Sequence, residues 1–396
     1  MSVLSIAFSM RSPLMLNRNF PYERANRIAD SKTIIDRYFD ERISRDLFLK
    51  YSRRVYNPLL SQAVIEAERS SKEGKPFVIC IATSGIFLDI ARRYDISIIN
   101  NLKKLEALGA LELIAMPYFH SLASLYPGGL DEFEEQVKLQ IELMKKIFST
   151  KISVLANSHL LYNDKVSKVV ESLGLQACLA EEINGTRKSP VYKVPNAEGV
   201  KVIVRSKDLS LAILEGRIEE LERTGKREGR YVVFLEAESL YPRGEGYSRL
   251  LISTLRASGV KLVGLSDLLE DLDSGTISIP EQLTTSLSEY GGSVKAWISN
   301  SMQRIAFERT ASLKTLIKEA GDDKIKNLWR MLQQSDFLLS MGDVGSHFDV
   351  FSTPAEAFAV YNTIFVDFEG KVATWVQRIR KSRVQTKQYG LRTYRK

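Results

Sequence analysis

Short apolar runs rich in β-branched residues recur along the first two thirds of the 396-residue chain. Such runs predict strands, and most of them are continuous rather than alternating, as expected when both faces of a parallel sheet are buried. Amphipathic helical patterns separate several of the runs, and this alternation predicts an α/β fold. The predicted strands are residues 3–8, 77–82, 111–116, 152–156, 177–180, 202–204, 231–235 and 260–263.

Two helices are predicted with particular clarity. Residues 130–148 carry a single apolar stripe that includes Phe133, Val137 and Met144. Residues 165–173 are expected to form a second helix, with Asp164 as its N-cap and Gly174 just past its end. Seven or eight strands with helical crossovers predict a barrel, whose functional residues lie on loops at the carboxyl ends of the strands.

The pattern changes to helical periods after residue 293. Three further helical segments are expected, at residues 297–316, 325–341 and 354–379, the last beginning at Pro354. We therefore predict a barrel over residues 1–285, a helical subdomain over 286–380 and a basic tail over 381–396. A helical insertion is expected within residues 20–60.

The positive charge of the chain is concentrated at its end. Residues 378–396 hold eight basic residues and no acidic one, so the remaining 48 basic residues match the 48 acidic residues. A nucleic-acid-binding surface on the body of the protein is therefore disfavoured. The tail is either a solvated end or a contact with an acidic partner. The sequence does not indicate an oligomeric state.

Several functional classes lack support in the sequence. Cys80 and Cys178 lie in apolar runs, where small buried side chains are expected rather than metal ligands, and they fit a reducing cytoplasm. No run approaches the roughly 18 apolar residues of a membrane span, and the first residues lack the features of a signal peptide. We find no zinc spacing, phosphate loop, dinucleotide fingerprint or nucleophile elbow, so we expect neither a metal nor a cofactor.

Polar side chains follow four of the predicted strands. The candidates are Arg11 after the first, Glu112 and His120 around the third, His159 after the fourth, and Glu236 with Glu238 after the seventh. For both histidines, a packed or hydrogen-bonded role is about as well supported as a chemical one. These residues alone specify no reaction.

Longer segments show a family resemblance. The stretches GALELIAMPYFHSLASLYPGGLDEFEEQVKLQIELMKKIF and NSHLLYNDKVSKVVESLGLQACLAE resemble glycoside hydrolase family 57, the α-amylase-like hydrolases and transferases that act on α-glucans. The likeness continues through RKSPVYK, FLEAES, AWISNSMQRIAFE, LQQSDF and FSTPAEAFAVYN. It implies a (β/α)7-type distorted TIM-like barrel with a C-terminal helical bundle, in agreement with the periodicity.

The resemblance also implies a catalytic pair, from which this chain departs. Retaining glycosidases use two carboxyl groups about 5 to 5.5 Å apart. His159 stands where the resemblance places the nucleophilic glutamate, and Glu236 stands where it places the acid/base aspartate. The family's His-x-His-Gln-Pro signature is Ser-Met-Arg-Ser-Pro here. Substrate contacts are implied for Arg11, Glu112, His120, Glu238, Trp297 and Asp336.

Three hypotheses follow from this departure. The first is a catalytically degenerate family member that binds an α-glucan or oligosaccharide, since loss of a covalent nucleophile is costly. The second is an active α-glucan hydrolase or glucanotransferase that uses Glu236 with either Glu238 or Glu181. The third is a regulatory subunit that contacts an acidic partner through its tail. Arg11 suits an anionic ligand such as a sugar phosphate, or a salt bridge to Glu236 or Glu112.

Overall fold

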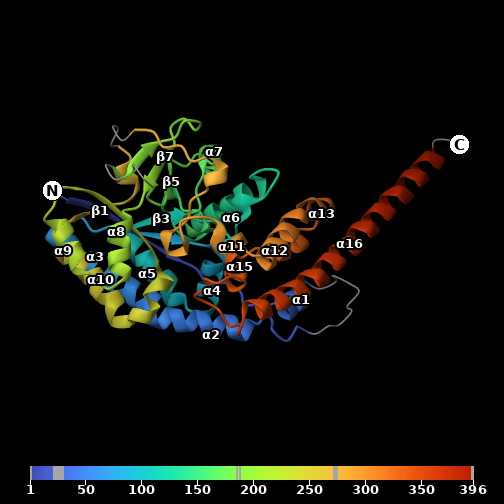
Figure 1. Cartoon of the computed structure of the whole chain (residues 1–396), viewed down its shortest axis with the longest axis horizontal. Coiled ribbons are helices and arrows are strands. Elements are labelled where there is room, and N and C mark those ends of the chain that lie inside the picture. The colour runs from blue at the N-terminus through green and yellow to red at the C-terminus, as the bar shows by residue number, and fades with distance from the viewer. Residues whose placement is uncertain (1, 21–30, 184–185, 187–188, 271–274, 394–396) are drawn as a thin grey trace. The chain divides into compact units, whose positions relative to one another are not determined.

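The computed structural model describes residues 2–20, 31–183, 186, 189–270 and 275–393 (Figure 1). The chain forms two compact units. The first consists of Met1–Pro13 and Arg45–Ala296, and the second consists of Leu14–Ser44 and Trp297–Lys396. The division into domains predicted from the sequence, at residues 285 and 380, stays a prediction about where independently folding parts end.

A single sheet of nine described strands forms the core of the first unit. Eight of its strands cover or adjoin the runs predicted from the sequence, which confirms the predicted α/β class. The strands are β1 (Ser2–Met10), β2 (Ile79–Thr83), β3 (Leu111–Ala115), β4 (Val154–Leu155), β5 (Ala177–Ala180), β6 (Val191–Lys193), β7 (Lys201–Val204), β8 (Gly229–Glu236) and β9 (Lys261–Leu262).

The parallel strands of the sheet close into a barrel of seven strands. The strand order runs β6-β7-β5-β4-β3-β2-β1-β8, and every described pair except β6–β7 is parallel. The backbone N–H of Ser206, just after β7, donates to the Val232 carbonyl of β8 at 2.6 Å and links the two ends of the series. β6, an antiparallel strand beside β7, was not predicted from the sequence.

Helices connect the strands of the first unit (Figure 1). The predicted helix 130–148 is α6, and Phe133, Val137 and Met144 are buried on it. The predicted cap of α7 is wrong, because Asn163 accepts from Lys165 N, whereas Asp164 accepts from Ile279 N. The helices are α2 (Glu41–Tyr51), which begins in the second unit, the π-helix η1 (Ser52–Tyr56), α3 (Asn57–Glu73), α4 (Gly85–Tyr94), α5 (Ile96–Ala107), α6 (Asp131–Ile147), α7 (Asp164–Ser172), α8 (Lys207–Leu214), α9 (Glu219–Gly225) and α10 (Glu245–Ala257).

The second unit is helical, as the sequence predicts. Its helices are α1 (Ser31–Tyr38), α12 (Ser301–Ser312), α13 (Lys314–Ala320), α14 (Asp323–Met331), α15 (Ser335–Ser340) and α16 (Pro354–Thr393), and the short α11 (Lys295–Ile298) spans the boundary. α16 begins at Pro354 as expected but continues well beyond residue 379. Arg380 on α16 donates twice to the Glu319 carboxylate, at 2.6 Å each. The contact of the basic tail with an acidic partner stays a prediction.

Two further expectations concern cysteines and membranes. Cys80 and Cys178 are free and buried, as predicted. Among the described residues, the structure contains no helix with the length and apolar character needed to cross a bilayer.

We expect Glu66→Gln to destabilise the first unit by weakening the contact between α3 and α10. Glu66 is 1% exposed, and its carboxylate accepts from Gln62 at 2.8 Å and from Arg256 of α10 at 2.6 Å. Loss of this charged hydrogen bond should lower the free energy of unfolding by about 1–3 kcal/mol in urea titrations. The exposed Glu68→Gln is the matched control, and an equal effect of both substitutions would contradict the argument.

Candidate active site

A buried ion pair joins the carboxyl ends of β1 and β8. The two strands are neighbours, with Ser9 opposite Glu236, so that Arg11 emerges beside this carboxylate. Arg11 Nη2 lies 3.1 Å from Glu236 Oε2, and the side chains are 1% and 4% exposed. Of the alternatives left open for Arg11, the structure therefore shows the salt bridge to Glu236.

Two further side chains hold the Glu236 carboxylate. His159 Nδ1 lies 2.8 Å from Oε1, and the Tyr290 hydroxyl donates to Oε2 at 2.5 Å. Arg11 Nη2 also donates to the Tyr290 hydroxyl oxygen at 3.2 Å. Both oxygens of Glu236 are thus engaged by protein groups rather than presented to a substrate.

Glu238 forms a second acidic position on the other side of Arg11. Its Oε1 accepts from the Arg11 backbone N–H at 2.9 Å and from the Tyr56 hydroxyl at 2.7 Å. Tyr56 is the last residue of η1, a helix type that is rare and often found at functional sites. Burial raises the pKa of Glu238 to about 7, although the charge on Arg11 opposes the shift. No described residue hydrogen-bonds its Oε2.

The two histidines adopt unusual backbone conformations at this site. Their rings meet edge to face with centroids 4.6 Å apart. His120, His159 and Leu160 have φ values of 49°, 53° and 51°, and no other non-glycine residue of the described chain has a positive φ. Burial holds the pKa of His120 well below its usual value, so His120 is neutral at pH 7. Strained backbone of this kind is concentrated at functional sites.

A returning segment delivers Tyr290 to this cluster. We call residues 284–292 the strap. Thr285 and Tyr162 exchange two backbone hydrogen bonds, at 3.0 and 3.1 Å, and Leu287 N donates to the His159 carbonyl at 2.9 Å. The strap is therefore fixed against the loop that follows β4.

Arg205, just after β7, anchors the strap from the opposite side. Its guanidinium donates to both oxygens of Glu181, at 2.9 and 2.6 Å, and to Glu289 Oε1 at 2.9 Å. It also donates to Ser288 Oγ at 2.8 Å, and Ser288 N donates to Glu181 at 2.6 Å. Arg205 thus fixes the two residues that precede Tyr290, and it engages Glu181, which the sequence suggested as a second catalytic carboxylate.

The structure brings together five of the predicted site residues and places Glu112 apart from them. Arg11, His120, His159, Glu236 and Glu238 form the cluster. Glu112 lies elsewhere, since its oxygens accept from Ser266 N at 3.1 and 3.2 Å and from Cys80 Sγ at 3.6 Å.

Trp297 and Asp336 belong to the second unit, where both are buried. Ser346 Oγ donates to Asp336 at 2.6 Å. In the described part of the chain, no three His, Cys, Asp or Glu side chains are arranged to hold a metal ion.

Sequence analysis missed the roles of Tyr290 and Arg205. Tyr290 lies in a loop segment that matches no motif, so nothing in the sequence marks it. Arg205 follows a predicted strand, as the candidates do, and a complete survey of charged residues at strand ends would have included it.

The family follows from this layout together with a match to known sequences. The model for Glycosyl hydrolase family 57 matches residues 5–214, a little over half of the chain. The chain belongs to glycosyl hydrolase family 57. The matched range includes Arg11, His120 and His159 but ends before Glu236. A protein of Methanocaldococcus jannaschii named "Putative alpha-amylase" is 26% identical over 93% of this chain and 84% of its own length.

Solved structures share the fold at lower sequence identity. A family 57 branching enzyme from Pyrococcus horikoshii gives a TM-score of 0.64 at 14% identity, covering 92% of this chain and 88% of its own. A 4-α-glucanotransferase from Thermococcus litoralis gives 0.61 at 12% identity, over 85% of this chain. This chain spans 56% of the length of the glucanotransferase. The likeness confirms the predicted (β/α)7-type barrel with a helical C-terminal part.

We expect Arg11→Met to lower the free energy of unfolding by about 3–5 kcal/mol, because it leaves the Glu236 charge buried without a cation. Glu236→Gln in the same chain should recover part of this loss. Urea denaturation of the two single variants and the double variant forms a double-mutant cycle that measures the coupling. Strictly additive effects would show that the two side chains do not stabilise each other.

The raised pKa of Glu238 predicts how the stability of the protein depends on pH. Its folded pKa of about 7 lies above the usual value of 4.5, so its contribution to stability is full below pH 4.5 and is lost as the pH rises through 7. Glu238→Gln retains an acceptor for Arg11 N and Tyr56 but cannot ionise. The variant should therefore gain stability relative to the wild type at pH 8 but not at pH 4.

Thermal unfolding of both proteins across this pH range measures the difference. The comparison cancels the contribution of His120, which titrates in both. A difference in stability that stays constant with pH would exclude the assigned shift of Glu238.

Proposed function

We propose that this protein is a catalytically degenerate member of glycosyl hydrolase family 57 that acts in carbohydrate metabolism by binding a saccharide. The observation that supports it most strongly is the state of the Glu236 carboxylate. An acid/base catalyst must transfer a proton between its oxygen and the glycosidic oxygen. Here His159 engages one Glu236 oxygen, and Arg11 and Tyr290 engage the other.

The position of the nucleophile supports the same proposal. His159, which stands where the family resemblance implies a glutamate, is 1% exposed and hydrogen-bonded to Glu236. An imidazole does not supply the carboxylate on which the retaining mechanism depends. Glu181 does not replace it readily, because Arg205 holds both of its oxygens.

One observation favours the alternative of an active α-glucan hydrolase or glucanotransferase. A pKa of about 7 suits a general acid near neutral pH, and Glu238 has that value together with an oxygen that no described residue hydrogen-bonds. Glu238 would then protonate the leaving group. Its complete burial opposes this role, since the side chain is 0% exposed.

We expect neither the wild type nor His159→Glu to release reducing ends from maltooligosaccharides or amylose. Restoring the carboxylate at residue 159 leaves Arg11 and Tyr290 on Glu236, so the acid remains engaged. Over a pH range of 4 to 9, a reducing-end assay measures hydrolysis, and chromatography of the maltooligosaccharide chain lengths measures transfer, with the glucanotransferase of Thermococcus litoralis as the positive control for transfer.

Two outcomes of this assay would reject degeneracy. Turnover by the wild type that is lost in Glu236→Gln would establish Glu236 as a working acid. Turnover lost in Glu238→Gln but retained in Glu236→Gln would instead establish the alternative enzyme.

A further inference from the structure

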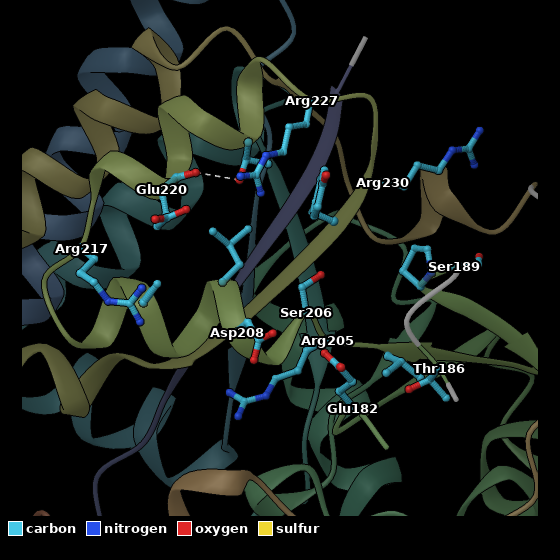
Figure 2. Close-up of a pocket in the computed structure, with 16 residues that line it drawn as sticks. Glu182, Thr186, Ser189, Arg205, Ser206, Asp208, Arg217, Glu220, Arg227 and Arg230 are labelled. Atoms are coloured by element: carbon cyan, nitrogen blue, oxygen red, sulfur yellow. Dashed lines mark hydrogen bonds between the residues drawn. The ribbon is translucent and has the colours of Figure 1, made fainter. Parts of the chain in front are cut away.

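A cavity of about 350 Å³ opens where β7 and β8 separate (Figure 2). β7 pairs with β5 and β6, while β8 pairs with β1, and the described backbone links β7 to β8 through Ser206 and Val232. The amino-terminal part of β8, at Arg230 and Tyr231, has no ladder with β7. The cavity occupies this gap, so it is a consequence of a barrel with seven strands rather than eight.

The walls of the cavity combine an apolar floor with a polar rim. Val204, Leu209 and Ala212 are buried in the wall, and the half-buried Tyr231 adds an aromatic ring. In Figure 2, Arg227 lies at the top of the view and Asp208 well below it, with Thr186 and Ser189 to the right. The rim carries charges of both signs, from Arg217, Arg227, Arg230, Glu182, Asp208 and Glu220. A fourth guanidinium, that of Arg205, also lines the cavity, but it is paired with Glu181 and Glu289.

The charges of the rim select the chemical class of the ligand. Three carboxylates would repel a phosphate or carboxylate, and three guanidinium groups would repel an ammonium ion. A sugar hydroxyl is neutral and both donates and accepts hydrogen bonds, so it is satisfied by such a mixed rim. Asp208 and Arg227 have no side-chain hydrogen bond or ion pair with any described residue, so both can engage a ligand without breaking an existing contact.

We propose that this cavity is a binding site for a neutral saccharide of one or two rings, separate from the Arg11–Glu236 cluster. The volume lies at the small end of the range of about 300–1,000 Å³ for ligand sites. The Tyr231 ring offers an apolar face for a pyranose, and Asp208 and Arg227 bind its hydroxyls as acceptor and donor. This inference rests on the proposed saccharide-binding function and assigns it a location.

The experiment compares three ligands of one skeleton, namely glucose, glucose 6-phosphate and glucosamine, together with maltose. Binding to the full chain is measured by ligand-observed NMR titration. We expect glucose and maltose to bind more tightly than either charged sugar. Asp208→Asn and Arg227→Gln should each weaken maltose binding at least fivefold, while Tyr231→Phe, which retains the ring, should change it less than twofold.

Lys226→Gln is the matched control for Arg227→Gln. Lys226 is exposed, adjoins Arg227 in the chain and does not line the cavity. Its substitution removes the same charge and should leave maltose affinity within twofold of the wild type. Because Asp208 and Arg227 are exposed and make no side-chain hydrogen bond or ion pair with the described residues, their variants should fold normally, and thermal unfolding checks this.

The outcomes separate this inference from the proposed function. Maltose binding that is unchanged in both Asp208→Asn and Arg227→Gln would overturn the cavity as the site while leaving saccharide binding intact. Glucose 6-phosphate binding more tightly than glucose, with loss in Arg227→Gln, would overturn the neutral class of ligand. No binding of any of these sugars would overturn both proposals.

Discussion

The ion pair between Arg11 and Glu236 is the constraint on which the rest of the site depends. Both side chains are almost fully buried, and transferring two charges from water costs several kcal/mol for each ion. The attraction between them offsets this cost only when hydrogen bonds satisfy the remaining polar atoms. His159, Tyr290 and the neighbouring Glu238 supply such bonds, directly to the carboxylate or to the backbone N–H of Arg11.

This requirement extends outward to the strap and to Arg205. Tyr290 can donate to Glu236 only if the strap holds it there, and the strap is fixed by the Tyr162 backbone on one side and by Arg205 on the other. Arg205 is itself buried and lies between Glu181 and Glu289. Arg11 after β1 therefore holds the carboxylate of Glu236, and Arg205 after β7 holds that of Glu181.

The sequence predicted those elements whose signals are local. Continuous apolar runs predicted the buried strands, and the stripe through Phe133, Val137 and Met144 predicted α6, because periodicity records which face is buried. The capping residue of α7 was predicted one position too late, because Asn163 and Asp164 are both good caps and only the tertiary contact of Asp164 with Ile279 decides between them.

The site was predicted only in part, because its decisive contacts join residues far apart in the chain. Arg11 had several possible partners in the sequence, and the register of β1 with β8 selects Glu236. Tyr290 reaches this carboxylate from a loop 54 positions away that carries no motif. Glu112 shows the opposite outcome: the family resemblance implied a substrate contact, yet its carboxylate accepts a hydrogen bond from the Ser266 backbone N–H.

The net charge of the buried cluster links the residue at position 159 to the residue at position 11. Arg11 carries one positive charge that Glu236 balances, while Glu238, with a pKa of about 7, is partly protonated, and His120 is neutral. A carboxylate at residue 159 would add a negative charge to this balance without a further cation. A histidine there adds no negative charge and forms a hydrogen bond with Glu236. A histidine after β4 is therefore compatible with the arginine after β1 and with Glu236, whereas it does not supply the second carboxylate that retaining glycoside cleavage requires.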